Sequence, residues 1–199
     1  MTTTHRFIQP CGPIPAKAVP EGDCWLHEAK FDGYRAQLHK VGSDVAIFSK
    51  HGYGLTMRFQ TITDLLRALP VKSVIIDAEI VANNRAGFPD FFSLHTRSAD
   101  PSAMNVWAFD LLMLNGRDLR EQSLEKRKAR LHALMERLDC PGVLMSQTFA
   151  DGQALLRAAH SARVGRAGVQ AEEVRGAGAI VRDDLVAPIR TAIRAQASA

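Results

Sequence analysis

An amine, a carboxylate and a guanidinium lie around one glycine in the stretch Glu28-Ala-Lys30-Phe-Asp32-Gly33-Tyr-Arg35. A lysine side chain has a reference pKa of about 10.4, so only about one molecule in 2,500 is neutral at pH 7. A lysine nucleophile therefore needs burial or neighbouring cations that lower its pKa, and Arg35 or a phosphate-bound metal ion would serve. The same spacing also fits a hairpin that carries solvated charges, so the stretch alone leaves both interpretations open.

Two further acids and one aromatic residue have types that suit a nucleotide site. Asp77 and Glu79 stand two apart in the β-branched run SVIIDAEIVA, so a strand would point both carboxylates to one side. Carboxylate oxygens suit Mg²⁺, and the aromatic face of Phe109 in NVWAFDLLML suits a purine. Taken singly, the two acids also fit an exposed edge strand, and a lone phenylalanine is more often a core residue.

The elements that must position these residues follow from periodicity and turn signals. Residues 1–22 are rich in Pro and Gly and predict an extended N-terminal segment. Strands are expected at 24–39 on both sides of Asp32-Gly33, and at 45–49, 73–82, 105–114 and 143–148. Helices are expected at 59–69 before Pro70, near 89–97, from Ser123 to 138 with a solvated charged face, and from Asp151 to about His160. The predicted class is α+β, with largely antiparallel sheets and packed helices.

Composition bounds the class of protein. The 199 residues are 46% hydrophobic and 23% charged, which is typical of a soluble globular chain. The sequence has no apolar run of membrane-spanning length and starts without the apolar stretch of a signal peptide, so we expect a cytoplasmic protein without a membrane partner. Three widely spaced cysteines, Cys11, Cys24 and Cys140, suggest neither a disulfide framework nor a zinc site.

The sequence changes character after residue 160. All thirteen aromatic residues lie between Phe7 and Phe149, and all seven lysines lie between Lys17 and Lys128. Residues 1–152 carry 18 basic and 17 acidic side chains, a net charge of +1, whereas residues 153–199 carry 7 and 4, a net charge of +3. We therefore expect residues 161–199 to be an atypical Ala/Arg/Gly-rich tail with poor packing and irregular structure.

The spacing Lys30-x-Asp32-Gly33-x-Arg35 resembles motif I, K-x-D-G-x-R, of the covalent nucleotidyltransferases, which comprise ATP-dependent DNA ligases, RNA ligases and capping enzymes. Three further stretches resemble later motifs of the family, in the family's order. They are Ser49-Lys50-His51-Gly52, Asp77-Ala78-Glu79, and Trp107-Ala-Phe109-Asp110-Leu111-Leu112 followed by Asn115-Gly116. The stretches FIQPCGP and ADGQALLRAA are similar to bacterial DNA ligases of the end-joining type. The resemblance covers about residues 7–160 and favours DNA ligase over the RNA ligase or capping-type alternative.

This resemblance implies an ATP-grasp-like adenylation domain and a role for each matching residue. Lys30 would attack the α-phosphate of ATP and form lysyl-AMP, for transfer to a DNA 5′-phosphate during nick sealing in repair or recombination. Phe109 would stack on adenine, and Glu79 would serve the ribose or a divalent metal, Mg²⁺ or Mn²⁺. The remaining implied nucleotide-binding residues are Glu28, Asp32, Gly33, Arg35 and Lys50. The implied partners are nicked or broken duplex DNA and end-joining proteins.

The family pattern is incomplete after residue 160. Motif IV, E-G-x-V-x-K, is replaced by RVGRAGVQAEE, and motif V, K-x-K, needs lysines that this sequence lacks after Lys128. We expect domain 1–160 to be a truncated adenylation domain, the tail 161–199 to be disordered or to result from a frameshift, and no oligonucleotide-binding barrel to follow. A catalytically inactive DNA- or partner-binding module therefore remains an alternative. The other reading frames of the gene would test the frameshift.

Overall fold

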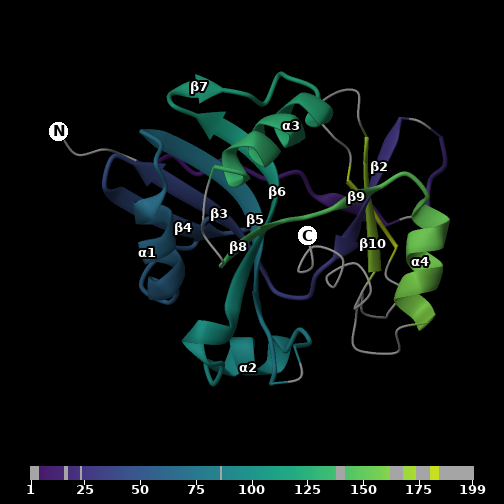
Figure 1. Ribbon diagram of the computed structural model, residues 1–199, viewed down its shortest axis with the longest axis horizontal. Helices are drawn as coiled ribbons and strands as arrows, with labels where there is room; N and C mark the ends of the chain where they lie inside the picture. The colour runs from purple at the N-terminus through teal and green to yellow at the C-terminus, as the bar shows by residue number, and fades with distance from the viewer. Residues whose placement is uncertain are drawn as a thin grey trace. The chain divides into compact units, whose positions relative to one another are not determined.

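The computed structural model describes residues 5–15, 18–22, 24–85, 87–137, 142–161, 168–173 and 180–183 (Figure 1). The chain divides into two compact units. Unit 1 comprises Met1–Pro10 and Gly33–Ser146, and unit 2 comprises Cys11–Asp32 and Gln147–Ala199. No helix in the described part of the chain is long and apolar enough to cross a membrane. The predicted domain boundary at residue 160 remains a prediction, and most of the expected tail lies outside the described residues.

Unit 1 is built on a sheet with the strand order β4-β3-β5-β6-β7, in which β8 also pairs with β6. Its strands are β3 (Tyr34–Val41), β4 (Asp44–Ser49), β5 (Ser73–Ala82), β6 (Met104–Leu114), β7 (Arg117–Asp118) and β8 (Val143–Met145). The β6–β8 pair is parallel and the other pairs are antiparallel. The helices are α1 (Gln60–Ala68), α2 (Phe91–Thr96) and α3 (Leu124–Met135), with a short 3₁₀ turn at Pro101–Ala103.

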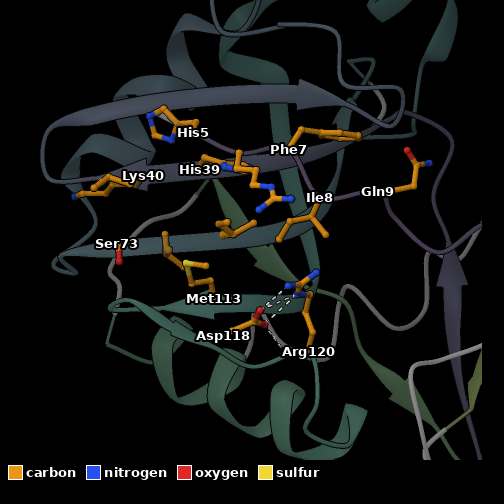
Figure 2. Close-up of a pocket in the computed structure, with 14 residues that line it drawn as sticks. His5, Phe7, Ile8, Gln9, His39, Lys40, Ser73, Met113, Asp118 and Arg120 are labelled. Carbon is orange, nitrogen blue, oxygen red and sulfur yellow. Dashed lines mark hydrogen bonds and ion pairs between the residues drawn. The ribbon is translucent and has the colours of Figure 1, made fainter. Parts of the chain in front are cut away.

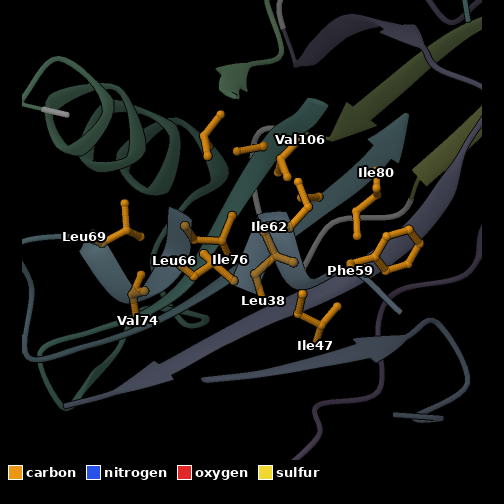
Figure 3. Close-up of a cluster of buried hydrophobic side chains, with 14 of the residues drawn as sticks. Leu38, Ile47, Phe59, Ile62, Leu66, Leu69, Val74, Ile76, Ile80 and Val106 are labelled. Atoms are coloured by element: carbon orange, nitrogen blue, oxygen red, sulfur yellow. The ribbon is translucent and has the colours of Figure 1, made fainter. Parts of the chain in front are cut away.

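One face of this sheet carries the main hydrophobic core. Because side chains alternate along a strand, the small and branched residues at every second position of β3 and β5 share one face, and they form a cluster with apolar residues of helices α1 and α3. Figure 3 shows the central part of this cluster, which includes Leu38, Ile62, Leu66, Ile76 and Ile80. The intervening positions, among them Arg35, Asp77 and Glu79, therefore belong to the opposite face of the sheet.

Unit 2 contains the second sheet, with the strand order β1-β11-β10-β2-β9. Its strands are β1 (Pro13–Pro15), β2 (Trp25–Lys30), β9 (Thr148–Phe149), β10 (Gly168–Glu173) and β11 (Ile180–Asp183), and its helix is α4 (Gly152–Ser161). This unit has a small hydrophobic core of Val19 and Leu155, against which the partly buried Phe149 and Leu156 pack. The Asp151 carboxylate accepts the Ala154 N–H at 2.8 Å and caps α4, as the sequence predicts.

The structure confirms the α+β class and the predicted helices, and it corrects three expectations. Strands β2 and β3 belong to different sheets, so the Asp32-Gly33 step is not a hairpin. The single strand expected at 143–148 is divided into β8 of unit 1 and β9 of unit 2. Strands β10 and β11 lie in the segment for which we expected irregular structure.

Candidate active site

Gly33 joins the loop after Lys30 to strand β5. Its N–H donates a hydrogen bond of 3.1 Å to Oε1 of Glu79. A Cβ atom at this position would lie 2.2 Å from the carbonyl oxygen of Ile80, far inside van der Waals contact. Glycine is therefore required by space, and the contact brings together two residues that the sequence assigned to the same site.

Arg35 and Asp77 form a buried ion pair on the same sheet face. Nε of Arg35 lies 3.2 Å from Oδ1 of Asp77, and Nη2 lies 2.9 Å from Oδ2. Both side chains are less than a tenth exposed, and β5 is an internal strand between β3 and β6. The alternative of exposed acids on an edge strand is therefore wrong for Asp77. Burial raises the pKa of the Asp77 carboxyl, Arg35 opposes that shift, and the neighbouring Asp110 adds to it.

Phe109 lies next to this ion pair, at an irregularity of strand β6. The guanidinium of Arg35 stands 5.3 Å from the centre of the Phe109 ring, within the range of a cation–π interaction. In the ladder between β5 and β6, Asp77 pairs with Asp110 and Ala78 with Ala108, so Phe109 is the additional residue of a β-bulge. The ring is 9% exposed, and its place beside Arg35 joins two predicted site residues.

Two cations of helix α3 contact the same part of β6, and neither was predicted from the sequence as a site residue. Arg127 reaches the Asp110 carboxylate at 2.8 and 3.0 Å, and Lys128 donates to the Phe109 carbonyl oxygen at 2.7 Å. Both side chains are buried, so the expected solvated charged face of this helix is wrong at these two positions. Asp110 stood within a recognised motif, but no sequence signal marked Arg127 or Lys128.

Lys30, Glu28 and Asp32 belong to unit 2. Lys30 ends strand β2 and pairs with Gly168 of β10, whereas Glu28 lies between Thr148 of β9 and Gln170 of β10. The Glu28 side chain is 1% exposed, and Lys30 and Asp32 are half-buried. The boundary between the two units falls between Asp32 and Gly33, so the motif that contains Lys30 extends over both.

Lys50 lies in the turn after β4 and contacts β3 through its backbone. Its N–H donates to the Arg35 carbonyl oxygen at 3.1 Å, while its side chain is exposed. The Ser49 hydroxyl accepts the N–H groups of His51 and Tyr53 at 3.3 and 3.1 Å, which shapes the turn. The turn is therefore tied to the strand that carries Arg35, and a role of the Lys50 side chain toward nucleotide stays a prediction.

A separate hollow of about 570 Å³ in unit 1 does not include the predicted site residues. It lies between the segment His5–Gln9 and strands β3, β5 and β6 (Figure 2). His5 and His39 line it together with the ion pair between Asp118 and Arg120. None of the residues in the cluster around Arg35 lines this hollow.

The carboxylates of the site bear on the metal prediction. Within the residues that the structure describes, no three His, Cys, Asp or Glu side chains gather closely enough to hold a metal ion. Glu79 offers one carboxylate, one oxygen of which already accepts the Gly33 N–H. Magnesium usually keeps several waters and binds one or two carboxylates together with substrate phosphates, so a single carboxylate at this place fits a nucleotide-bound Mg²⁺.

Comparisons with known proteins give one consistent result. Residues 9–163 match the family described as ATP dependent DNA ligase domain. The chain is 33% identical over 134 residues to the multifunctional non-homologous end joining protein LigD of Pseudomonas aeruginosa, covering 66% of this chain and 16% of that protein. It is 32% identical over 186 residues to a probable DNA ligase of Mycolicibacterium vanbaalenii, covering 85% of this chain and 34% of that protein. The chain therefore spans far less than two thirds of these relatives.

Solved structures support the fold. The ligase domain from M. tuberculosis LigD superposes with a TM-score of 0.72 at 22% identity, covering 87% of this chain and 60% of that one. A mycobacterial DNA ligase D complexed with ATP and MES gives a TM-score of 0.70 at 23% identity with the same coverage. At these identities the likeness establishes the fold, and it confirms the adenylation-domain architecture expected from the motifs.

Proposed function

Because the chain belongs to the ATP-dependent DNA ligase domain family, we propose that it carries out the nucleotidyl-transfer chemistry of an end-joining type DNA ligase. Lys30 receives AMP from ATP and passes it to the 5′-phosphate of a nicked or broken duplex. Glu28, Asp32, Gly33, Arg35, Lys50, Glu79 and Phe109 surround the nucleotide. The proposed setting is DNA repair or recombination, with end-joining proteins as partners.

The chemistry balances in three displacements at phosphorus. The neutral amine of Lys30 forms a bond to the α-phosphorus of ATP, the bond to the bridging oxygen breaks, pyrophosphate leaves, and the amine loses a proton to solvent. An oxygen of the DNA 5′-phosphate then attacks the same phosphorus, and the phosphorus–nitrogen bond breaks with return of a proton to Lys30. Finally the 3′-hydroxyl oxygen attacks the 5′-phosphate, AMP leaves, and the hydroxyl proton is released.

The contact between Gly33 and Glu79 is the observation that carries the proposal. It joins the loop of the lysine motif to the acid of the third motif, through a hydrogen bond of 3.1 Å and a position with no room for a side chain. Arg35, the last residue of the lysine motif, lies against Phe109, the aromatic residue of the next motif. Three motifs far apart in sequence thus meet on one sheet face in unit 1.

A divalent metal ion, Mg²⁺ or Mn²⁺, belongs to the proposal as the companion of ATP. When bound it would neutralise charge on the phosphate oxygens. Glu79 is the residue that we assign to it, because its carboxylate lies where the first and third motifs meet. Arg35 contributes differently, since its charge is compensated by buried Asp77 and its guanidinium is held in one orientation.

Covalent labelling tests the proposal. The purified chain is incubated with α-labelled ATP and Mg²⁺, and the labelled peptide is mapped. We expect the label on Lys30, with loss in both Lys30→Ala and Lys30→Arg, because arginine keeps the charge but cannot become a neutral amine nucleophile. Lys72→Ala, at an exposed lysine of unit 1, is the matched control and should keep the label. Label that persists in either Lys30 variant contradicts the assignment.

The stretch RVGRAGVQAEE, which departs from the motif IV pattern, favours a second candidate, an inactive DNA- or partner-binding module. Positioned cations contribute on the order of several kcal/mol to phosphoryl-transfer transition states, so a motif IV stretch without its lysine would cost orders of magnitude in rate. A folded chain that binds nicked duplex but acquires no label would support this candidate. Transfer of AMP to nicked RNA in preference to nicked DNA would instead support an RNA ligase.

A further inference from the structure

Strand β6 has a gap in its pairing at the residues that follow the proposed adenine-binding position. On its edge away from β5, β8 pairs with Val106 to Ala108 and β7 pairs with Met113 and Leu114. The Leu119 N–H extends the β7 side by donating to the Leu112 carbonyl oxygen at 2.9 Å, and among the described strands none continues this pairing along residues 109–111. The β-bulge at Phe109 falls at the start of this gap, so its backbone is displaced from the β5 ladder as well.

Helix α3 fills the gap with two consecutive cations. Lys128 is 5% exposed, and its ammonium donates to the carbonyl oxygen of Phe109 at 2.7 Å. A buried carbonyl without a donor is destabilising, and a donor that carries charge forms the stronger kind of hydrogen bond. Lys128 therefore satisfies the backbone group that the bulge removes from the sheet, and it fixes the backbone from which the Phe109 ring projects.

Arg127 meets the acidic residue next to the bulge. It binds both carboxylate oxygens of Asp110 and also donates to the carbonyl oxygen of Gln122 at 2.6 Å. Asp110 stands opposite Asp77 in the strand register, so two carboxylates face each other across the ladder. Arg127 pairs with Asp110, and Arg35 pairs with Asp77. Because Arg127 already compensates the charge of Asp110, Arg35 stays paired with Asp77 and lies against the Phe109 ring.

We propose that Lys128 and Arg127 are positioning residues for nucleotide binding: they act through Phe109 and Arg35, which they hold in the orientation that receives the base and the phosphate. The inference rests on the proposed function, since it assigns the base to Phe109. Lys128 acts on the ring through the backbone, whereas Arg127 acts on Arg35 by occupying Asp110. Both cations come from one turn of α3, so the helix is part of the site through its effect on β6.

The test is a double-mutant cycle on ATP affinity. The dissociation constant of ATP is measured by calorimetry for the wild-type chain, Lys128→Met, Phe109→Leu and the double variant. A positioning role predicts that Lys128→Met weakens ATP binding about tenfold in the wild-type background and less than about twofold once the ring is gone. The matched control Lys126→Met changes an exposed cation of the same helix and should leave the affinity within about twofold.

Three results separate the possibilities. A smaller loss in the Phe109→Leu background supports the inference, whereas equal losses in both backgrounds show that Lys128 acts only on general stability and overturn it. Lys128→Gln, which keeps an N–H donor, is measured in parallel and replaces Lys128→Met if that variant does not fold. We expect it to lose less ATP affinity, and to lose less in the Phe109→Leu background than in the wild-type background. A folded wild-type chain that binds no ATP overturns the proposed function itself, and the positioning role with it.

Discussion

At the scale of single residues, Gly33 has the least freedom to change. Its missing side chain leaves room for the Ile80 carbonyl oxygen, which a Cβ would approach to 2.2 Å. We expect Gly33→Ala to displace the loop from Glu79 and to lower the free energy of unfolding by about 2–3 kcal/mol. Urea denaturation measures this. Gly54→Ala is the control, because a Cβ at Gly54 would meet nothing within 4 Å and should leave stability within about 0.5 kcal/mol.

His39 should give the protein a dependence on pH. Burial, and secondly the charge of nearby His5, lower the pKa of His39 to about 4. Between pH 6.5 and 4 the unfolded chain therefore binds a proton that the folded chain does not, so stability is complete above pH 6.5 and falls as the pH drops. The loss reaches up to about 3 kcal/mol near pH 4. Nε2 of His39 lies 3.3 Å from Oε1 of Gln37, and the imidazole ring packs edge-on to Phe48.

Urea unfolding at pH 7, 5.5 and 4.5 measures this dependence. His39→Gln should flatten the profile because the variant has no imidazole to protonate. The exposed His51→Gln is the control and should leave the slope unchanged. A profile that keeps its slope in His39→Gln would assign the pH dependence to the carboxylates instead.

At the scale of secondary structure, helix α3 shows where reasoning from sequence succeeds and where it stops. The apolar positions Leu124, Leu131 and Leu134 are buried as their spacing predicts. The same pattern assigned Arg127 and Lys128 to solvent, because periodicity compares a residue only with its own helix. Their burial depends on a carboxylate and a carbonyl of β6, 17 and 19 residues away, which only the tertiary structure brings within reach.

The strands also show that sequence patterns do not reveal structure that depends on tertiary contacts. β5 and β6 were predictable because runs of branched and apolar residues are typical of buried strands. β10 was not, since GVQAEE has few large apolar side chains and its strand forms by pairing along β2. The candidate site could be proposed from motif residues, including Arg35, Glu79 and Phe109, and their roles stay a prediction. The contacts that orient them, from Asp77, Asp110 and helix α3, could not be predicted.

Replacement of Arg127 should test how much the α3–β6 contact contributes to stability. Arg127→Met leaves the Asp110 carboxylate, which is 14% exposed, without its guanidinium, and we expect a cost of about 2–4 kcal/mol, below that of a fully buried pair. Arg130→Met, at an exposed position of the same helix, should change stability by less than about 0.5 kcal/mol. The double variant Arg127→Met with Asp110→Asn should recover part of the loss, because the uncompensated charge is removed. Thermal and urea unfolding of the four proteins decide this.

At the scale of the whole molecule, charge is distributed unevenly between the early and late parts of the sequence. Residues 1–152 have a net charge of +1 and residues 153–199 a net charge of +3. Nucleic-acid affinity from phosphate contacts falls steeply with salt. We therefore expect this 199-residue chain to bind nicked duplex weakly, with a strong salt dependence to which the late arginines contribute.

Substitution tests this more cleanly than truncation. Deletion from residue 161 would remove β10, which pairs along the whole of β2. Arg190→Gln with Arg194→Gln, at two positions outside the described residues, should lower affinity at low salt and reduce the slope of log affinity against log salt by about 1–2. Unchanged affinity and slope in this double variant would contradict the charge argument.

The order of strands in unit 2 has a consequence for synthesis of the protein. Strand β2, which ends at Lys30, pairs with β9 at Thr148–Phe149 and with β10 at Gly168–Glu173. The ribosome must therefore add more than a hundred residues before β2 meets either neighbour, which takes on the order of ten seconds. Strands β3 to β6 of unit 1 leave the ribosome earlier and have their mutual partners close in sequence. The nascent chain thus completes much of one sheet while the strand that ends at Lys30 is still unpaired, exposed to chaperones and to pairing with neighbouring chains.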